Sequence, residues 1–308
     1  PHVVEAIRSA LRGDNLRKYP DPMGTGFRQV AGKVLGVDPD AILIGNGSDD
    51  ILTIVTRSFA GENGLIVSLT PSYLLYRTLA EIQGAGYQEV PFEVNWQLPI
   101  PWPVCQASLT FVASPNSPSG TALKTEDLKR LAEELSGPLV IDEAYADFAD
   151  RNALELAHLA RVIVTRSLSK SYSLAGIRFG FAVAEPALIR ELVKVKDSYN
   201  CDVLSLVAAT AALEDQESML TNRIRILATR ARLEQSMKKL GFDVVPSQAN
   251  FLWCSRHDQP VKPLYEELKR RMILVRYMNY PGYGDGLRIS VGTDAEIDRL
   301  VEELKQLV

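Results

Sequence analysis

The sequence is poor in cysteine and contains no long apolar run. Its 308 residues include three cysteines, Cys105, Cys201 and Cys254, which lie far apart and form no CxxC or CxxH pattern. We therefore expect reduced thiols in a cytoplasmic protein, and neither a disulfide framework nor a bound metal. No apolar run reaches the roughly 18 residues that a membrane span requires, and no signal peptide is recognisable, so we predict no contact with a membrane.

No long block of like charges occurs either. The chain carries 34 basic and 38 acidic residues, a net charge of −4, and both signs are mixed along its length. This argues against a nucleic-acid-binding protein whose affinity depends on neutralising phosphates, whereas a small phosphorylated ligand needs only a few local donors. The sequence also lacks the pattern GxxxxGK(S/T), which argues against a P-loop nucleotide hydrolase.

Short apolar runs alternate with segments of helical spacing in the first two thirds of the chain. Apolar residues at helical spacing occupy one face at 51–59 and another at 128–135, where Thr125 is the expected cap. The alternation predicts an α/β protein with a mostly parallel sheet covered on both faces. The expected strands are Ile42–Ile44, Leu65–Leu69, Leu109–Ala113, Leu139–Ile141, Val162–Thr165 and Phe179–Val183.

The pattern changes after about residue 187. Helical stretches cover roughly 187–240, and a last helix follows a capping box formed by Thr293 and Glu296. We predict a large domain over 20–220 and a small α+β domain made of 1–19 and 221–308. The strands expected in the small domain are Phe242–Val245, Asn250–Trp253, Ile273–Arg276 and Leu287–Val291.

A lysine surrounded by small hydroxyl residues follows one of the predicted strands. Lys170 lies in Ser-Leu-Ser-Lys after the run that ends at Thr165, and Arg178 comes eight residues later. A lysine amine can form a Schiff base with a carbonyl compound, while an arginine fork and serine hydroxyls suit a phosphate. The alternative is a surface loop with one solvated lysine.

Two further polar residues follow predicted strands. Asp142 ends an apolar run, at the edge where open α/β sheets bind ligands, and a buried carboxylate there needs a hydrogen-bonding or cationic partner such as a protonated pyridine nitrogen. Asp142 can equally serve as a metal ligand or a helix cap. Asn116 lies in a loop whose two prolines and one glycine fix the backbone and aim its amide, and the alternative is an ordinary turn.

In this order, the three segments resemble the fold-type I, pyridoxal-phosphate-dependent aminotransferases. The matching motifs are the asparagine loop PNxPxG, the aspartate motif DEAY and the lysine motif SLSK followed by GxRxG. From about residue 19 to the C-terminus the chain resembles the histidinol-phosphate aminotransferases in particular. The segments that carry this narrower resemblance are Tyr19–Pro22, Gly45–Asp50, Pro71–Tyr76, Ser247–Phe251 and Gly286–Gly292.

The sequence departs from the family pattern in small ways. The asparagine loop usually reads NNPTG, and here it reads Asn116-Ser-Pro-Ser-Gly; the usual GSDE ends here in Asp50. Family members usually carry an extended segment before the first helix. The present sequence starts at Pro1, inside the expected helix, so we expect it to lack that segment.

The resemblance implies a role for each residue around the cofactor ring. Lys170 would form the internal aldimine and then, as a neutral amine, move the proton between the substrate carbon and the cofactor. Asp142 would pair with the pyridine nitrogen and keep the ring an electron sink. Tyr145 and Asn116 would donate to the ring oxygen, and Tyr73 would stack on the ring.

The resemblance also implies a phosphate cradle, a shared dimer and a substrate subsite. Tyr19 would reach the phosphate held by the other subunit of a homodimer. Arg288 would hold the anionic group of the substrate and Arg276 would add a second fork, although either arginine can instead pair with a surface acid. Asn250 would line the pocket or cap a strand. The cradle itself would consist of Ser48, Asp49, Ser167, Ser169 and Arg178.

The expected function is a ping-pong aminotransferase of histidine biosynthesis. It would convert histidinol phosphate and 2-oxoglutarate to imidazole-acetol phosphate and glutamate with pyridoxal 5'-phosphate. The alternatives are an aromatic or broad amino-acid aminotransferase, a threonine-phosphate decarboxylase, and a cofactor-binding protein without turnover. Fold alone does not choose among them, because specificity belongs to the site.

Overall fold

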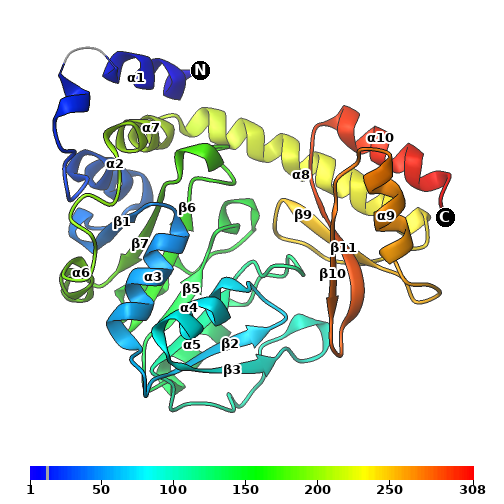
Figure 1. The fold of residues 1–308 in the computed structure, drawn as a ribbon, viewed down its shortest axis with the longest axis horizontal. Coiled ribbons are helices and arrows are strands. Elements are labelled where there is room, and N and C mark those ends of the chain that lie inside the picture. The colour runs from blue at the N-terminus through cyan, green and yellow to red at the C-terminus, as the bar shows by residue number, and fades with distance from the viewer. Residues whose placement is uncertain (12–13) are drawn as a thin grey trace.

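The structure is a computed structural model that describes residues 1–11 and 14–308, and it contains two β-sheets (Figure 1). In the larger sheet the strand order is β1-β7-β6-β5-β4-β2-β3, with β3, β2, β4, β5 and β6 parallel and β7 antiparallel to both of its neighbours. This confirms the predicted α/β class with a mostly parallel sheet. Its strands are β1 (Ile42–Gly45), β2 (Leu65–Thr70), β3 (Gly86–Pro91), β4 (Leu109–Ala113), β5 (Leu139–Asp142), β6 (Val162–Ser167) and β7 (Gly180–Ala184).

Helices cover both faces of this sheet because its strands are apolar on both sides. Val140 packs into one core cluster, while its neighbours Leu139 and Ile141 pack into the other, as the two-residue repeat of a strand requires. Figure 1 shows the resulting three layers. One face carries α2 (Thr25–Leu35), α5 (Thr125–Glu134) and α7 (Val203–Glu214), and the other carries α3 (Ser48–Phe59), α4 (Leu75–Gln83) and α6 (Pro186–Val193).

The smaller sheet is antiparallel throughout and has the strand order β10-β11-β9-β8. Helix α8 (Gln216–Lys239), drawn in yellow in Figure 1, runs from the large sheet to the small one. This part confirms the predicted α+β character of the C-terminal region. Its other elements are β8 (Asp243–Val245), β9 (Phe251–Ser255), α9 (Lys262–Arg270), β10 (Arg276–Tyr280), β11 (Gly284–Ser290) and α10 (Asp294–Lys305).

The predicted division into domains stays a prediction. Helix α1 (His2–Ala10), which it assigned to the small domain, packs against α7 of the large sheet. Short 3₁₀ segments connect several elements: Asn15–Arg17, Pro39–Ala41, Val94–Trp96, Ala146–Phe148, Leu154–His158 and Ala175–Ile177.

The elements differ from the sequence prediction in several places. Strand β3 was missed, because it lies at the sheet edge and has no apolar run. Strand β10 begins at Arg276 and not at Ile273. The expected cap Thr125 is wrong: Lys124 is the N-cap of α5, and the Thr125 hydroxyl instead donates to the carbonyl of Asn152 over 3.3 Å.

The capping box of the last helix is confirmed. The Thr293 hydroxyl accepts from the backbone N–H of Glu296, and the Glu296 carboxylate accepts from the backbone N–H of Thr293. Within the described residues 1–11 and 14–308, no helix is long and apolar enough to cross a membrane.

Replacing Leu252 by alanine tests the core of the small sheet. Leu252 lies in β9, is 0% exposed and packs among apolar residues of α8, α9 and α10. We expect Leu252→Ala to lower the free energy of unfolding by about 2–5 kcal/mol, because lost burial and a new cavity both contribute. Urea denaturation measures this. Leu274→Ala is the control, since Leu274 is 81% exposed, and an equal loss in both variants would contradict the expectation.

Candidate active site

The predicted site residues gather where the carboxyl ends of the parallel strands β4, β5 and β6 meet. A cavity of about 250 Å³ lies there, between this edge and two strands of the small sheet. Such an edge is where open α/β sheets bind ligands. The predicted residues that line the cavity are Ser48, Asp49, Tyr73, Asp142, Tyr145, Ser167, Ser169, Lys170, Arg178, Arg276 and Arg288.

Asp142 is the buried carboxylate of the cavity and is 5% exposed. One of its oxygens accepts from the Tyr76 hydroxyl at 2.9 Å, and the other accepts from the Thr165 hydroxyl at 3.3 Å and the backbone N–H of Ala144 at 3.2 Å. Burial raises the pKa of Asp142, and the hydrogen bond from Tyr76 is the strongest influence in the opposite direction. The carboxylate is held in place by donors of no net charge.

Lys170 brings an amine to the same cavity. Its Nζ lies 5.5 Å from the centre of the Tyr145 ring. Burial lowers the pKa of Lys170, and the nearby guanidinium of Arg288 lowers it further. Both influences favour the neutral amine, which is the form that can act as a nucleophile or a base.

The first turn of α3 faces Arg178 across a tight backbone contact. Ser48 begins α3, so its N–H and that of Asp49 belong to the first turn, where backbone donors have no partner within the helix. A Cβ on Gly180 would lie 2.4 Å from the backbone nitrogen of Ser48, and one on Gly47 would lie 2.8 Å from a guanidinium nitrogen of Arg178. Gly180 has no room for a side chain because the atoms it would meet are backbone, and Gly47 has a φ of +84°, which favours glycine. Free backbone donors beside a guanidinium are a suitable arrangement for binding an anion.

The Asp49 carboxylate itself faces donors of the protein. It accepts from the Tyr73 hydroxyl at 3.2 Å and from Arg178 at 3.3 Å. What Asp49 offers to an anion is therefore its backbone N–H. Burial and Asp49 together raise the pKa of Tyr73 to about 12, so this hydroxyl stays protonated.

Two arginines enter the cavity from the small sheet. Arg276 of β10 and Arg288 of β11 are directly paired in the register of that sheet. Arg288 donates to the Ser117 hydroxyl at 2.8 Å, and its buried Nε has no hydrogen-bond partner. Within the part of the chain that the structure describes, neither guanidinium forms a salt bridge, so the expected alternative of a surface acid is not observed.

Three predicted residues do not line the cavity. Asn116 is fully buried behind it: its oxygen accepts from Ser72 at 2.8 Å, and its nitrogen donates to Pro71 and Ser119 at 3.1 Å each. Tyr19 is 80% exposed and stacks on Tyr199, with ring centres 4.5 Å apart. Asn250 precedes β9, where its carbonyl accepts from the backbone N–H of Val291 at 2.8 Å.

Sequence reasoning missed three residues that support the site. Tyr76 and Thr165 donate to Asp142, and Ser117 accepts from Arg288. Tyr76 and Ser117 lie inside motifs that were recognised, but the motifs gave them no role. Thr165 carried a usable signal, because it lies two residues before Ser167 on β6 and so shares its side of the sheet.

The comparisons with known proteins agree with this geometry. The sequence pattern of the family described as aminotransferase class I and II matches residues 1–304. The chain belongs to this family. The aminotransferase chain is 50% identical over 300 residues to the histidinol-phosphate aminotransferase of Rhodopirellula baltica, a match that covers 96% of this chain and 83% of that protein. It is 46% identical over 310 residues to histidinol-phosphate aminotransferase 1 of Trichormus variabilis, covering 100% and 88%.

Solved structures give the same result for the fold. The histidinol-phosphate aminotransferase from Sinorhizobium meliloti, in complex with pyridoxal-5'-phosphate, has a TM-score of 0.90 at 26% identity and covers 100% of this chain and 88% of its own. An aspartate aminotransferase from Thermotoga maritima has a TM-score of 0.85 at 21% identity, which shows the shared fold alone. The aminotransferase resemblance and the fold-type I architecture are thus confirmed.

Asp142→Asn tests the cost of burying the carboxylate. Because burial raises the pKa of Asp142 above its ordinary 3.8, the folded protein holds a proton there to higher pH than the unfolded chain does. Stability therefore falls as pH rises from the ordinary pKa through the raised one. Asparagine has no such dependence, so we expect the ligand-free variant to be more stable than wild type at pH 7 and to lose this advantage below about pH 4.

Thermal unfolding of the ligand-free proteins across that pH range measures the difference. Glu155→Asn is a control for the removal of one charge at an exposed position. An advantage of Asp142→Asn that is equal at every pH would show that charge burial is not its cause.

Proposed function

We propose that this aminotransferase transfers the amino group of histidinol phosphate to 2-oxoglutarate. The observation that carries the proposal is the convergence of a neutral-prone lysine, a buried carboxylate and two register-paired arginines on one cavity. The names of the relatives at 50% and 46% identity support the same reaction. The resulting activity belongs to histidine biosynthesis.

The cavity fits pyridoxal 5'-phosphate as the cofactor. The first turn of α3, the serines Ser167 and Ser169, and Arg178 line one part of the cavity with donors suited to its phosphate. Asp142 suits the protonated ring nitrogen, because a cation would offset the cost of the buried carboxylate. When bound, the cofactor supplies a ring that accepts the negative charge developing on the substrate.

The remaining residues orient the ring and move the proton. Burial lowers the pKa of Lys170, which favours the neutral amine whose Nζ can take a proton from the substrate carbon and return it. Tyr73 is proposed to stack on the ring and Tyr145 to donate to the ring oxygen. Asn116 is proposed to reach the same oxygen, for which its nitrogen would exchange one of its two contacts, to the Pro71 carbonyl or to the Ser119 hydroxyl.

Arg288 and Arg276 are proposed to bind the phosphate of the substrate. Two guanidinium groups from adjacent strands suit a dianion, since each presents a planar fork of donors. The buried Nε of Arg288 still has a donor to offer. Asn250, at the start of the neighbouring strand β9, is proposed to border this subsite.

Tyr19 supports a homodimer with shared active sites. Its ring lies outside its own cavity and is 80% exposed, so its hydroxyl is available to a second copy of the chain. We propose that it reaches the cofactor phosphate of that copy. We also propose a cytoplasmic location, which suits the three free thiols.

A half-reaction screen tests the proposed substrate. Purified protein loaded with pyridoxal 5'-phosphate is mixed with one amine at a time, without an acceptor, and the loss of the aldehyde-form absorbance is recorded. We expect histidinol phosphate to give the largest specificity constant. Its phosphate suits the two arginines, and it is the amine in the panel that also carries an imidazole. Phenylalanine and threonine phosphate are the comparison amines, and Lys170→Ala should react with none of them.

Each other result identifies a different alternative. A preference for phenylalanine would indicate an aromatic aminotransferase, and release of carbon dioxide from threonine phosphate would indicate a decarboxylase. No reaction with any amine would leave a binding protein without turnover.

Mixing two inactive variants tests the shared site. Tyr19→Ala and Lys170→Ala are unfolded and refolded together, so that about half of the dimers contain one of each. If Tyr19 serves the other subunit, each mixed dimer has one intact site, and the mixture regains about a quarter of wild-type activity. If Tyr19 serves its own subunit, every site lacks one residue and the mixture regains nothing. Separately refolded variants, combined afterwards, are the control.

A further inference from the structure

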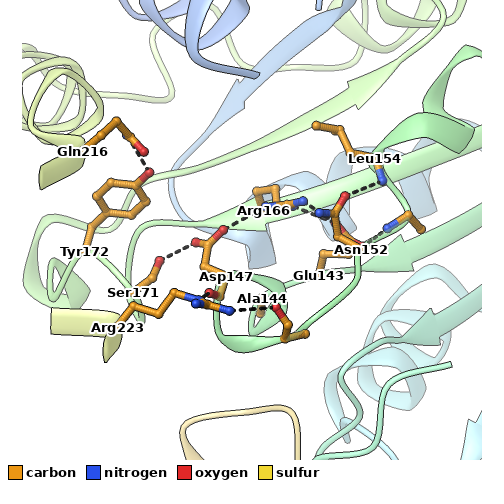
Figure 2. A network of polar contacts seen from close by, with 12 residues as sticks. Glu143, Ala144, Asp147, Asn152, Leu154, Arg166, Ser171, Tyr172, Gln216 and Arg223 are labelled. Carbon is orange, nitrogen blue, oxygen red and sulfur yellow. Dashed lines mark hydrogen bonds and ion pairs between the residues drawn. The ribbon is translucent and has the colours of Figure 1, made fainter. Parts of the chain in front are cut away.

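A buried polar network joins β6 and the turn after it to the segment after β5, and it contains none of the residues assigned above (Figure 2). Its centre is Arg166, whose side chain is 8% exposed. Arg166 donates through Nε to Glu143 at 2.7 Å and through Nη1 to Asp147 at 2.9 Å. The second oxygen of Asp147 accepts from the Ser171 hydroxyl. We call Glu143, Arg166, Asp147 and Ser171 the rear network.

We infer that the rear network is a positioning device that fixes Lys170 and Asp142 relative to each other. Glu143 directly follows Asp142, Arg166 directly precedes Ser167, and Ser171 directly follows Lys170. Arg166 and Ser167 lie on β6, where consecutive side chains point to opposite sides. Glu143 and Ser171 each follow a site residue by one position, so the contacts of the rear network restrain the backbone that carries the site residues. The inference rests on the proposed function, because it concerns the residues that function uses.

The ties of the rear network differ in what they hold. The pair of Arg166 and Glu143 joins β6 to the end of β5, the strand that carries Asp142. The bond from Ser171 to Asp147 instead joins the turn after Lys170 to the segment after β5. Ser171 is therefore the tie that holds the lysine in particular.

Helix α8 adds a link from the small sheet. Arg223 donates from α8 to the carbonyl of Asp147 at 2.6 Å and to the carbonyl of Ala149 at 3.1 Å. Further along α8, Leu233 packs in the core under the small sheet, which carries the two arginines of the cavity. One helix thus contacts both the rear network and the core that supports the substrate subsite.

Ser171 and Arg223 are the positions at which to test the inference. Removing Arg166 or Glu143 would leave a buried charge without its partner, so those variants report on folding. Ser171→Ala deletes only the tie to the lysine turn, and Ser171→Thr keeps the hydroxyl. Arg223→Gln removes the guanidinium that donates to the Asp147 carbonyl, and Arg223 is partly exposed. Ser236→Ala is the matched control, since its hydroxyl donates to the carbonyl of Arg232 at 3.0 Å on α8, outside the cavity.

The readout is the titration of Lys170 in protein stripped of cofactor. Trace acetylation with acetic anhydride across a pH range, followed by mass spectrometry of the Lys170 peptide, gives the midpoint at which the amine loses its proton. The charged groups near Lys170 are Arg288, Asp49, Arg178 and Asp142, and all of them stay in the variants.

We expect Ser171→Ala and Arg223→Gln to move the midpoint upward, toward that of an ordinary lysine. A loosened turn admits water to the amine, and at a pH below the midpoint we expect at least about a twofold fall in the neutral fraction. Ser171→Thr and Ser236→Ala should keep the wild-type midpoint. In the loaded enzyme, the same two variants should lower kcat and leave KM for the amine nearly unchanged.

A purely structural role would give a different pattern. If Ser171→Ala and Arg223→Gln lower the melting temperature but keep the wild-type midpoint, the inference is overturned. The midpoint needs neither cofactor nor turnover. A failure of the half-reaction screen would therefore overturn the proposed function, and an unmoved midpoint would overturn only the positioning role.

Discussion

A carboxylate that leaves water must find donors or a cation, and in this protein that constraint falls on Asp142. Three donors surround it, from α4, β6 and the segment after β5, and none of them carries a charge. Burial raises its pKa, so the ligand-free cavity contains a carboxylate whose charge a cation would stabilise. Burial has the opposite effect on Lys170 in the same cavity and lowers its pKa. Burial thus shifts the two pKa values in opposite directions, and each shift favours the uncharged form of its group.

The fold could be predicted largely from the sequence because central strands buried on both faces appear as continuous apolar runs. β3 was missed because an edge strand has no such run. Within the site, motif letters identified the residues at strand ends, but not their partners. Tyr76 meets Asp142 across 66 residues of chain, and only the three-dimensional arrangement brings them together. For the same reason, motif letters could not show that Asn116 lies behind the cavity wall, where it is hydrogen-bonded to Ser72 and Pro71 of a distant segment.

The cavity is built from two sheets with different duties. The parallel sheet contributes the lysine, the carboxylate and the anion cradle, all at strand ends or helix starts that the core holds firmly. The antiparallel sheet contributes a pair of guanidinium groups, whose spacing is set by strand register. Helix α8 contacts both parts, as Figure 1 shows. Under the proposed function, the parallel sheet would provide the reacting groups and the antiparallel sheet the substrate subsite, in line with the general rule that specificity belongs to the site and not to the fold.

The close approach of Gly180 to Ser48 has a consequence for how such a protein can change. A Cβ atom on Gly180 would lie only 2.4 Å from the backbone nitrogen of Ser48. A side chain therefore cannot be added at Gly180 without moving β7 or α3. A single substitution of Gly180 would therefore disturb the backbone around the proposed phosphate site. The arginine-bearing strands are under no such restriction, because their cavity-facing positions already hold side chains. New substrate preferences within this architecture should arise by exchanging residues on the small sheet, while the cradle is inherited unaltered.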